Sequence, residues 1–506
     1  MSEYNELESL QKLPTGIEGF EHISHGGLTK KRATLIVGTS GSGKTYLAYE
    51  ILHRSITQFE KPGVFVTMEE KPVDIIINFR ELGWHLDQLI DQKKLRLIDA
   101  SPDLDSVPEI GEYNLKALIA RISHALKEIN GSIVVIDSIG SLFHQFTKTM
   151  VIRREISRII NTFKEQGHTV IFTAERINEY GGVSRYGIEE FISDNVIILR
   201  NILEDEKVRR TIQILKMRGK THEKGEFPFS LTEQGISIMP LSKRELKQSS
   251  SNVRCSLGNK KLDEITSGGI FRDSVMLISG PTGCGKTLMC ATFVNNACQN
   301  NEKIIMFAYE ESKQQLMRNA KSWGIDFEKF EKAGLLKVVC LYPEAMGLEE
   351  HLLLIQKEIK IFKPRRLVMD SVSAMERVAG IRIFREFVIG LTSFVKQEEV
   401  CSLFTSTTPQ LAGGDSITEA HISTITDIII LLRYVELRGD LRRGIAVIKM
   451  RGSQHQKSIY EFTIDSNGLK IEKPFNTVSN IILGTPVEST TDEKEQLSKI
   501  FNNEVV

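Results

Sequence analysis

The chain has 506 residues, 41% of them hydrophobic and 26% charged, and its 65 basic and 65 acidic side chains leave a formal net charge of zero. A chain of this length exceeds what one compact core holds, so we expect two or three domains. The zero net charge argues against a protein that works on nucleic acid. The longest apolar runs are far shorter than the about 20 residues needed to cross a bilayer.

The cysteines and the first residues indicate a cytoplasmic protein. All six cysteines lie in the second half of the chain without CxxC spacing, and Cys284 stands inside a glycine-rich loop, so we expect reduced thiols. The opening MSEYNELESLQKL is acidic and lacks the apolar segment of a secretory signal.

Helix-length segments alternate, in chain order, with apolar runs that predict buried strands: ATLIVG (33–38), GVFVTME (63–69), SIVVID (132–137), TVIFTAE (169–175) and NVIILR (195–200). Several of these runs are apolar on both faces, which is typical of parallel strands covered by helices on both sides. We therefore predict an α/β fold with a mainly parallel central sheet.

The same series of motifs then occurs a second time. HGGLTKKRATLIVGTSGSGKT (25–45) corresponds to SGGIFRDSVMLISGPTGCGKT (267–287), and ILKMRG (214–219) corresponds to VIKMRG (447–452). The matched segments lie more than 200 residues apart (25 and 267, 214 and 447), and a repeat of this length indicates a duplicated domain rather than a short solenoid repeat. We place the domains at 1–241 and 255–474, a polar linker at 242–254, and a C-terminal loop and tail at 475–506.

Each copy contains a phosphate-binding loop of the form GxxxxGK[ST], directly after an apolar strand and before a helical segment. Glycines let backbone N–H groups face phosphate oxygens, and the helix N-terminus adds its dipole. The lysine reaches the β- and γ-phosphates, and the threonine offers a hydroxyl to Mg²⁺. The predicted ATP contacts are Gly41, Ser42, Gly43, Lys44 and Thr45 in the first copy, and Gly283, Cys284, Gly285, Lys286 and Thr287 in the second.

Acidic residues follow two strands of each copy. Asp137 and Asp370 end apolar strands and are predicted to hold Mg²⁺ together with the P-loop threonines, although a carboxylate there is often only a helix cap. The pairs Glu69–Glu70 and Glu310–Glu311 end the strands that follow the P-loop helices. One Glu of each pair is predicted to orient or deprotonate the attacking oxygen, and Glu310 also to assist the metal.

The motif KMRG also occurs in both copies, with Lys216 and Arg218 in the first and Lys449 and Arg451 in the second. Alternation along a strand puts the Lys and the Arg on the same side. Because these charges lie far along the chain from their own P-loop, we predict that they contact the nucleotide of a neighbouring subunit in a ring. A solvated K-x-R pair is the alternative.

With these residues in view, the chain resembles the RecA-type ATPases, and specifically the KaiC family of circadian clock ATPases and autokinases. The resemblance covers nearly the full length and includes PGVFVTMEE (62–70), KMRGKTHEKGE (216–226), AHISTITD (420–427) and KMRGSQHQK (449–457). It implies two tandem RecA-like P-loop NTPase domains that form a homohexamer of two stacked rings. It also implies ATP hydrolysis in the first ring and reversible autophosphorylation in the second.

The resemblance further implies roles for single residues and partners. Ser423 and Thr424 match the family's phosphorylated residues, and Glu310 matches its kinase general base. The implied partners are a KaiB-like protein on the first ring, a KaiA-like protein at the C-terminal tail and a histidine kinase-type output protein. The further nucleotide contacts implied are Lys216, Met217, Arg218 and His222 in the first ring, and Trp323, Lys449, Met450, Arg451 and His455 in the second.

The chain departs from the family pattern at three places. Ala420 stands where the best-known members have Ser, and Gln454 stands where they often have Trp beside the adenine. The tail is recognisable at IILGTP (481–486), but its end is short and divergent.

Only the second copy has hydroxyls at the candidate acceptor positions. When the copies are aligned on Asp194 and Asp427, Thr424 falls opposite Phe191 and Ser423 opposite Glu190. A phosphoryl acceptor must stand in line with the γ-phosphate, so we predict water as the only acceptor in the first copy and protein hydroxyls in the second.

Two other functions are compatible with the motifs. A RecA-like recombinase or ring helicase would use the same core as a DNA-dependent ATPase, but the zero net charge and the lack of a zinc module argue against it. A scaffold could use hydrolysis only to time its assembly, and Ser and Thr would then be ordinary strand-entry residues.

Overall fold

The computed structural model describes residues 10–101, 115–141, 149–187, 189–204, 207–239, 251–408, 422, 424–437, 439–465 and 468–475, with two short strands at 478–479 and 487–488. The chain forms two compact units, Met1–Pro240 and Leu241–Val506. Their division falls next to the linker that we predicted, and the finer limits of domains, linker and tail stay predictions.

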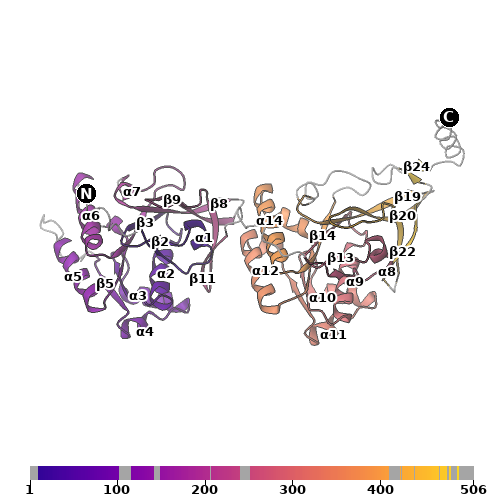
Figure 1. Cartoon of the computed structure of the whole chain (residues 1–506), viewed down its shortest axis with the longest axis horizontal. Coiled ribbons are helices and arrows are strands. Elements are labelled where there is room, and N and C mark those ends of the chain that lie inside the picture. The colour runs from indigo at the N-terminus through magenta and orange to yellow at the C-terminus, as the bar shows by residue number, and fades with distance from the viewer. Residues whose placement is uncertain are drawn as a thin grey trace. The chain divides into compact units, whose positions relative to one another are not determined.

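A nine-stranded sheet in the order β11-β10-β9-β8-β3-β7-β6-β4-β5 forms the centre of the first unit (Figure 1). The strands from β8 to β5 run parallel, and β9, β10 and β11 add antiparallel pairs at the other edge. The bounds are β3 (Ala33–Gly38), β4 (Gly63–Thr67), β5 (Leu95–Asp99), β6 (Ile133–Asp137), β7 (Thr169–Glu175), β8 (Asn195–Glu204), β9 (Lys207–Met217), β10 (Phe227–Thr232) and β11 (Gly235–Ile238), with β1 (Lys12–Leu13) and β2 (Leu28–Thr29) paired separately.

Helices cover both faces of this sheet because its strands are apolar on both faces. Ile36 of β3 belongs to the core under α1–α4, and its neighbour Leu35 to the core under α5 and α6. The helices are α1 (Phe20–Ser24), α2 (Lys44–Thr57), α3 (Pro72–Glu81), α4 (Leu86–Asp91), α5 (Leu115–Glu128), α6 (Thr149–Glu165) and α7 (Glu189–Ile192). The prediction of a mainly parallel α/β fold is confirmed.

The second unit repeats this architecture with a sheet in the order β16-β15-β17-β18-β14-β19-β20-β21-β22. Its strands are β14 (Val275–Gly280), β15 (Ile304–Ala308), β16 (Leu336–Cys340), β17 (Arg366–Asp370), β18 (Cys401–Thr407), β19 (Ile428–Leu437), β20 (Asp440–Met450), β21 (Tyr460–Asp465) and β22 (Gly468–Pro474). Two short pairs complete the list, β12 (Arg254–Cys255) with β13 (Ile270–Phe271) and β23 (Val478–Ser479) with β24 (Val487–Glu488).

The helices of the second unit follow the same two-layer plan. One apolar core lies between the sheet and α8–α11, and α12 and α14 pack against each other at the opposite layer. Their bounds are α8 (Lys260–Ile265), α9 (Lys286–Gln299), α10 (Lys313–Ser322), α11 (Phe327–Lys332), α12 (Leu348–Phe362), α13 (Val372–Glu376) and α14 (Ile381–Gln397), with a 3₁₀ turn at Pro343–Ala345.

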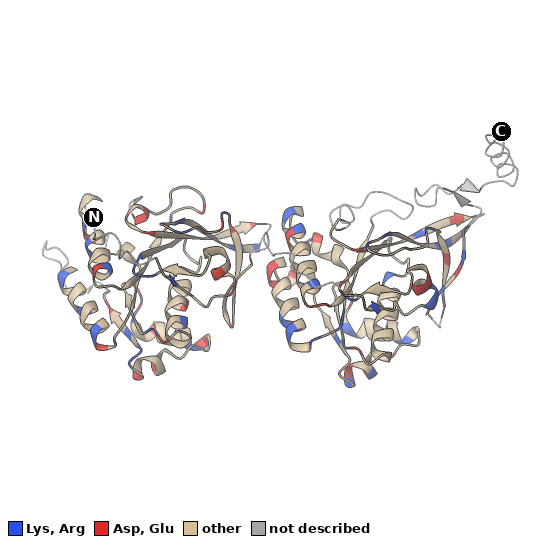
Figure 2. Cartoon of the chain, viewed as in Figure 1, with Lys and Arg blue, Asp and Glu red and all other residues tan. Residues whose placement is uncertain are grey.

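Three whole-chain expectations bear on function. All six cysteines are free thiols, as we predicted. Figure 2 shows basic and acidic residues intermixed over the described parts of both units. Among the described helices, none combines the length and the apolar composition of a membrane-crossing segment.

A half-buried histidine makes the stability of the first unit depend on pH. His53 of α2 stacks on Trp84 at a centroid distance of 4.9 Å, and burial, with a smaller contribution from Arg54, lowers its pKa from 6.5 to about 4. A histidine whose folded pKa is depressed contributes full stability above its unfolded pKa, and this stability is lost as the pH falls from about 6.5 towards 4. We expect a loss of roughly 2–3 kcal/mol between pH 7 and 4.5 from this residue.

The measurement is denaturant unfolding of the full chain at both pH values, followed by Trp84 fluorescence in a Trp323→Phe background. His53→Gln should remove roughly 2–3 kcal/mol of the pH dependence. An equal loss with and without His53 would contradict the prediction.

Candidate nucleotide-binding sites

The first P-loop joins the end of β3 to the start of α2. Gly41 and Gly43 have positive φ angles of 73° and 92°, a backbone region that side chains with a Cβ rarely adopt. Gly43 caps α2, so the first N–H groups of this helix are free to face a phosphate group. The ammonium of Lys44 turns towards the loop, where it donates to the carbonyl oxygen of Thr39 at 2.8 Å.

The second P-loop has the same conformation between β14 and α9. Gly283 and Gly285 have φ angles of 77° and 109°, and Lys286 donates to the carbonyl oxygens of Gly280 and Pro281 at 2.8 and 2.9 Å. The side chain of Cys284 is fully buried, and burial raises the pKa of its thiol. Cys284 therefore offers its backbone to a ligand, with a protonated side chain packed inside.

The metal-site residues predicted in the first unit lie together at the carboxyl edge of its sheet. Asp137 ends β6 and accepts hydrogen bonds from the hydroxyls of Thr45 and Thr173. The hydroxyl of Ser138 donates to Glu69. Oxygen donors of this type, completed by phosphate oxygens and water, suit Mg²⁺.

The second unit brings the equivalent residues together. The hydroxyl of Thr287 donates to Asp370 at 2.8 Å, and Thr405 donates to the other carboxylate oxygen. Glu310 accepts from Ser371 at 3.3 Å and from Arg377 at 3.1 Å. Both units also share a cis peptide after the aspartate.

The glutamate pairs lie slightly farther along the chain than we predicted. β4 ends at Thr67 and β15 at Ala308, so each pair occupies the turn after the strand rather than its last residues. The hydroxyl of Thr67 donates to the carbonyl oxygen of Glu70, and this bond turns the chain out of the sheet.

The acidic clusters raise the pKa values of their own members. Burial first, and then the charges of Asp137, Asp74 and Glu69, raise the pKa of Glu70. Burial and the charge of Asp370 likewise raise the pKa of Glu311. Burial also raises the pKa of Asp137 and lowers that of Lys44. A bound cation with its phosphates would compensate these unfavourable charges.

A cavity of about 290 Å³ opens beside the first acidic cluster. It lies at the carboxyl edge of the parallel strands, which is where open α/β sheets bind ligands. Its lining residues are Glu69, Ser138, Gly140, Ser141, Glu175, Arg185, Tyr186 and Glu189.

Sequence reasoning missed the hydroxyls that hold these carboxylates. Thr173 and Thr405 each donate to the aspartate of the neighbouring strand, and Ser138 and Ser371 each donate to a glutamate that we predicted to be catalytic. The shared FT pair in TVIFTAE and CSLFTST was the available signal.

The KMRG charges of the first unit lie at the amino-terminal ends of the parallel strands, whereas their own P-loop lies at the carboxyl ends. Strand register pairs Met217 with Asn195, which is paired with Thr34 near the start of β3, whereas the P-loop follows Gly38. Lys216 bonds the carbonyl oxygens of Glu190 and Ser193 at 2.9 and 2.7 Å, farther from that P-loop.

The arginines of this motif stand just past the strands that we predicted for them. β9 ends at Met217 and β20 at Met450, and the N–H groups of the arginines that follow bond the carbonyl oxygens of Asp194 and Asp427. Asp194 in turn bonds the first strand residue, Ala33, so Arg218 lies about five strand residues, or roughly 17 Å, from the P-loop end of β3.

In the second unit, Thr424 likewise lies at the amino-terminal ends of the parallel strands. Its carbonyl oxygen accepts from Arg451 at 2.8 Å, and the nearby Asp427 bonds Val275, the first residue of β14. The P-loop begins at the other end of β14, again roughly 17 Å away. Thr424 is exposed, whereas Ser423 and Ala420 lie outside the described residues.

Hydrogen bonds support the alignment that places Phe191 opposite Thr424. Ser193 donates to the carbonyl oxygen of Glu189 at 2.6 Å, and Thr426 donates to that of Ile422 at 3.2 Å. These pairs bracket the two candidate acceptor positions. Phe191 is 64% exposed, so the first unit presents an aromatic ring where the second presents a hydroxyl.

Among the described residues, the remaining predicted contacts bond or pack against parts of their own unit. His222 bonds the carbonyl oxygen of Glu223 at 2.9 Å, and Trp323 caps α10 while packing against the core. His455 is half-buried, and Gln454 accepts a bond from Ser267 at its carbonyl oxygen. Their proposed contacts with a nucleotide stay predictions.

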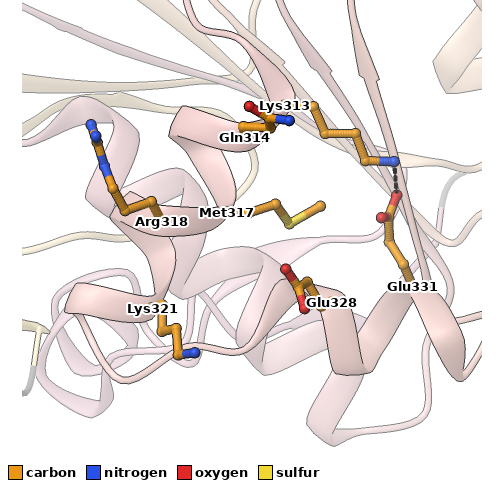
Figure 3. A pocket seen from close by; sticks show the side chains of 7 residues that line it. All are labelled: Lys313, Gln314, Met317, Arg318, Lys321, Glu328 and Glu331. Carbon is orange, nitrogen blue, oxygen red and sulfur yellow. Dashed lines mark hydrogen bonds and ion pairs between the residues drawn. The ribbon is translucent and has the colours of Figure 1, made fainter.

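A second cavity, of about 520 Å³, lies between α10 and α11 (Figure 3). Lys313 and Glu331 form an ion pair across it at 2.9 Å. Its lining contains none of the site residues predicted from the sequence: it consists of Lys313, Gln314, Met317, Arg318, Lys321, Glu328 and Glu331.

Comparison with known proteins identifies the duplicated domain. The family model "ATPase: KaiC" matches residues 13–243 and 255–475. The chain belongs to the KaiC family of ATPases. The circadian clock oscillator protein KaiC of Synechococcus elongatus is 52% identical over 496 residues, covering 98% of this chain and 96% of its own.

Other KaiC relatives agree with this assignment. KaiC of Parasynechococcus marenigrum is 52% identical over 491 residues, covering 97% of this chain and 96% of its own. KaiC of Thermosynechococcus vestitus is 52% identical over 491 residues, with coverages of 97% and 95%. The resemblance predicted from the motifs is confirmed, and membership of this ATPase family means that the chain binds nucleotide.

Proposed function

We propose that the chain is a clock protein that hydrolyses ATP in its first unit and phosphorylates its own Thr424 and Ser423 in its second. The proposal includes a homohexamer of two stacked rings with ATP and Mg²⁺ at the subunit boundaries. The observation that carries it is the separation, within each unit, of the P-loop from the Lys–Arg pair. A subunit with its P-loop at the carboxyl ends of the strands and its Lys–Arg pair at the amino-terminal ends completes a nucleotide site only together with a neighbouring subunit.

The chain's own residues divide the reaction as follows. The P-loop backbone and Lys286 hold the phosphates, and Arg451 of the adjacent subunit stabilises charge on the γ-phosphoryl group. Glu310 accepts the proton of the Thr424 hydroxyl of the adjacent subunit as that hydroxyl oxygen bonds phosphorus and the bond between phosphorus and ADP breaks. Thr287 and Asp370 would hold Mg²⁺, which would supply positive charge beside the phosphate oxygens.

Water takes the place of the hydroxyl in the first unit, because Phe191 and Glu190 offer no acceptor. Glu69 or Glu70 then orients the attacking water. Phosphate added at Thr424 would bring about two negative charges next to Arg451 and so alter the contacts of this edge with a neighbour.

Three partners and the location complete the proposal. We assign a KaiB-like protein to the first ring, a KaiA-like protein to the tail, and a histidine kinase-type protein to the output. The free thiols agree with a cytoplasmic location.

Mass spectrometry after incubation with ATP and Mg²⁺ tests the kinase assignment. We expect phosphate on Thr424 and Ser423, and none after Ser423→Ala combined with Thr424→Ala, while ATP hydrolysis by the first unit continues. If both hydroxyls stay unmodified with and without KaiA-like and KaiB-like proteins, the chain is an ATPase without autokinase activity.

A further inference from the structure

A loop of the first unit is fastened to the P-loop by one carboxylate. Glu179 lies in the segment 176–187, between β7 and α7. One of its carboxylate oxygens accepts a hydrogen bond from the hydroxyl of Thr39, the second residue of the P-loop. The other accepts from the backbone N–H of Asn201 in β8 at 3.0 Å. Glu179 thus joins the P-loop, its own loop and the sheet.

The loop is held in place around this contact. Arg200 donates to the carbonyl oxygen of Glu179 at 3.1 Å and lies over the ring of Tyr180 at 5.1 Å. The guanidinium of the buried Arg176 donates to the carbonyl oxygen of Gly182 at 2.9 and 3.1 Å. These bonds give segment 176–187 a defined conformation.

The other end of the loop contacts the segment that carries Lys216. The hydroxyl of Ser184 bonds Glu189 at 2.7 Å and Glu190 at 2.5 Å. Lys216 donates to the carbonyl oxygen of Glu190 at 2.9 Å. A continuous series of bonds therefore runs from the P-loop at one edge of the sheet to the Lys216 side chain at the other.

Both members of the fastening contact are missing from the second copy. Pro281 stands where the first P-loop has Thr39. The Gly-Gly pairs at 181–182 and 413–414 align Glu179 with Leu411, which lies outside the described residues. Donor and acceptor are thus replaced together, so the contact belongs to the hydrolysing unit alone.

We propose that Glu179 is a positioning residue of the first site, which links nucleotide at the P-loop to the placement of Lys216 at the opposite edge. This inference rests on the proposed contact of Lys216 with the nucleotide of a neighbouring subunit. Nucleotide that changes the conformation of the P-loop at Thr39 moves Glu179 and with it segment 176–187. Because Ser184 of this segment bonds Glu190, and Lys216 bonds the carbonyl oxygen of Glu190, the Lys216 side chain moves as well. Successive sites around the first ring are thereby coupled.

Hydrogen exchange on isotopically heavy full chains, assembled with an excess of light Lys44→Ala chains whose first P-loop holds nucleotide poorly, with and without a nonhydrolysable ATP analogue, tests the link without direct contact of Lys216 by a neighbour's nucleotide. In the wild-type protein we expect the analogue to change protection in peptides covering 39–45 and 207–218. In Glu179→Ala the change at 39–45 remains and the change at 207–218 is lost. The Asn201 amide, deprived of its charged acceptor, exchanges roughly tenfold faster.

Thr39→Val removes the donor and is the partner variant. It should reproduce the loss at 207–218, and the double variant should add nothing, as expected for two residues that act through one contact. Glu165→Ala, an exposed position on α6, is the matched control and keeps both responses. An unchanged response at 207–218 in Glu179→Ala would overturn the proposal.

The proposed trans role of Lys216 is tested separately. Lys216→Ala should lower ATP hydrolysis whether or not the Glu179 link exists. An unaffected ATPase in Lys216→Ala refutes the trans contact, whereas intact coupling in Glu179→Ala refutes only the link.

Discussion

A mixture of two inactive variants is expected to regain autophosphorylation, and only one of them is expected to carry the phosphate. Lys286→Ala lacks the lysine that holds the phosphates and is a poor donor, while Ser423→Ala combined with Thr424→Ala lacks the acceptor. Each alone should fall at least roughly a hundredfold below wild type. Because Thr424 lies roughly 17 Å from its own P-loop along β14, transfer must cross between subunits, and the mixture should phosphorylate the Lys286→Ala chain.

The measurement is phosphopeptide analysis after joint assembly, with the Lys286→Ala chain isotopically heavy. Lys332→Ala, which changes an exposed lysine at the end of α11, is the control and should label itself normally. Mixed rings that form but leave the heavy chain without phosphate would show that transfer occurs within one subunit, contrary to the geometry of the sheet.

The second large effect is expected from the arginines of the KMRG motif. Arg218→Ala should slow ATP hydrolysis by the first unit, and Arg451→Ala should slow phosphorylation of Thr424, each by roughly a hundredfold or more, since an arginine supplied to a γ-phosphoryl group in trans accelerates transfer by about 10³–10⁵. Each arginine pairs loosely with an aspartate of its own chain, at 3.8 Å in both units, and Arg451 also donates to the carbonyl oxygen of Thr424 at 2.8 Å. Both arginine side chains are more than half exposed, so the loss of either should have little effect on folding.

Separate assays of phosphate release and of phosphopeptide formation distinguish the two variants. Arg153→Ala, on the exposed face of α6, is the control for loss of a surface cation. If both arginine variants hydrolyse ATP and label Thr424 at wild-type rates while the ring stays assembled, the motif has no catalytic role.

The fold and the nucleotide loops could be predicted well because they depend on local chemistry. The P-loop requires positive φ at Gly41, Gly43, Gly283 and Gly285, and few residues other than glycine adopt it. The continuous apolar runs predicted parallel strands, since only strands covered on both faces, such as that containing Leu35 and Ile36, are apolar at consecutive positions. Duplication then strengthened each assignment.

The limits of elements were less predictable. β4 ends at Thr67, whose hydroxyl bonds the carbonyl oxygen of Glu70, and β9 ends at Met217. The glutamates and arginines that follow therefore lie in turns, where their side chains are not confined to one face of a sheet.

The residue pattern was sufficient for the family, the two P-loops and the contrast between Phe191 and Thr424, because these depend on which side chains occupy matched positions. Only the tertiary structure shows whether each group lies at the carboxyl or at the amino-terminal ends of the parallel strands. Strand register, which one sequence does not reveal, separates Lys216 and Thr424 from their own P-loops by the length of a strand. The same register brings Glu179, remote from the P-loop in sequence, onto Thr39, because β7 and β3 are neighbours in the sheet.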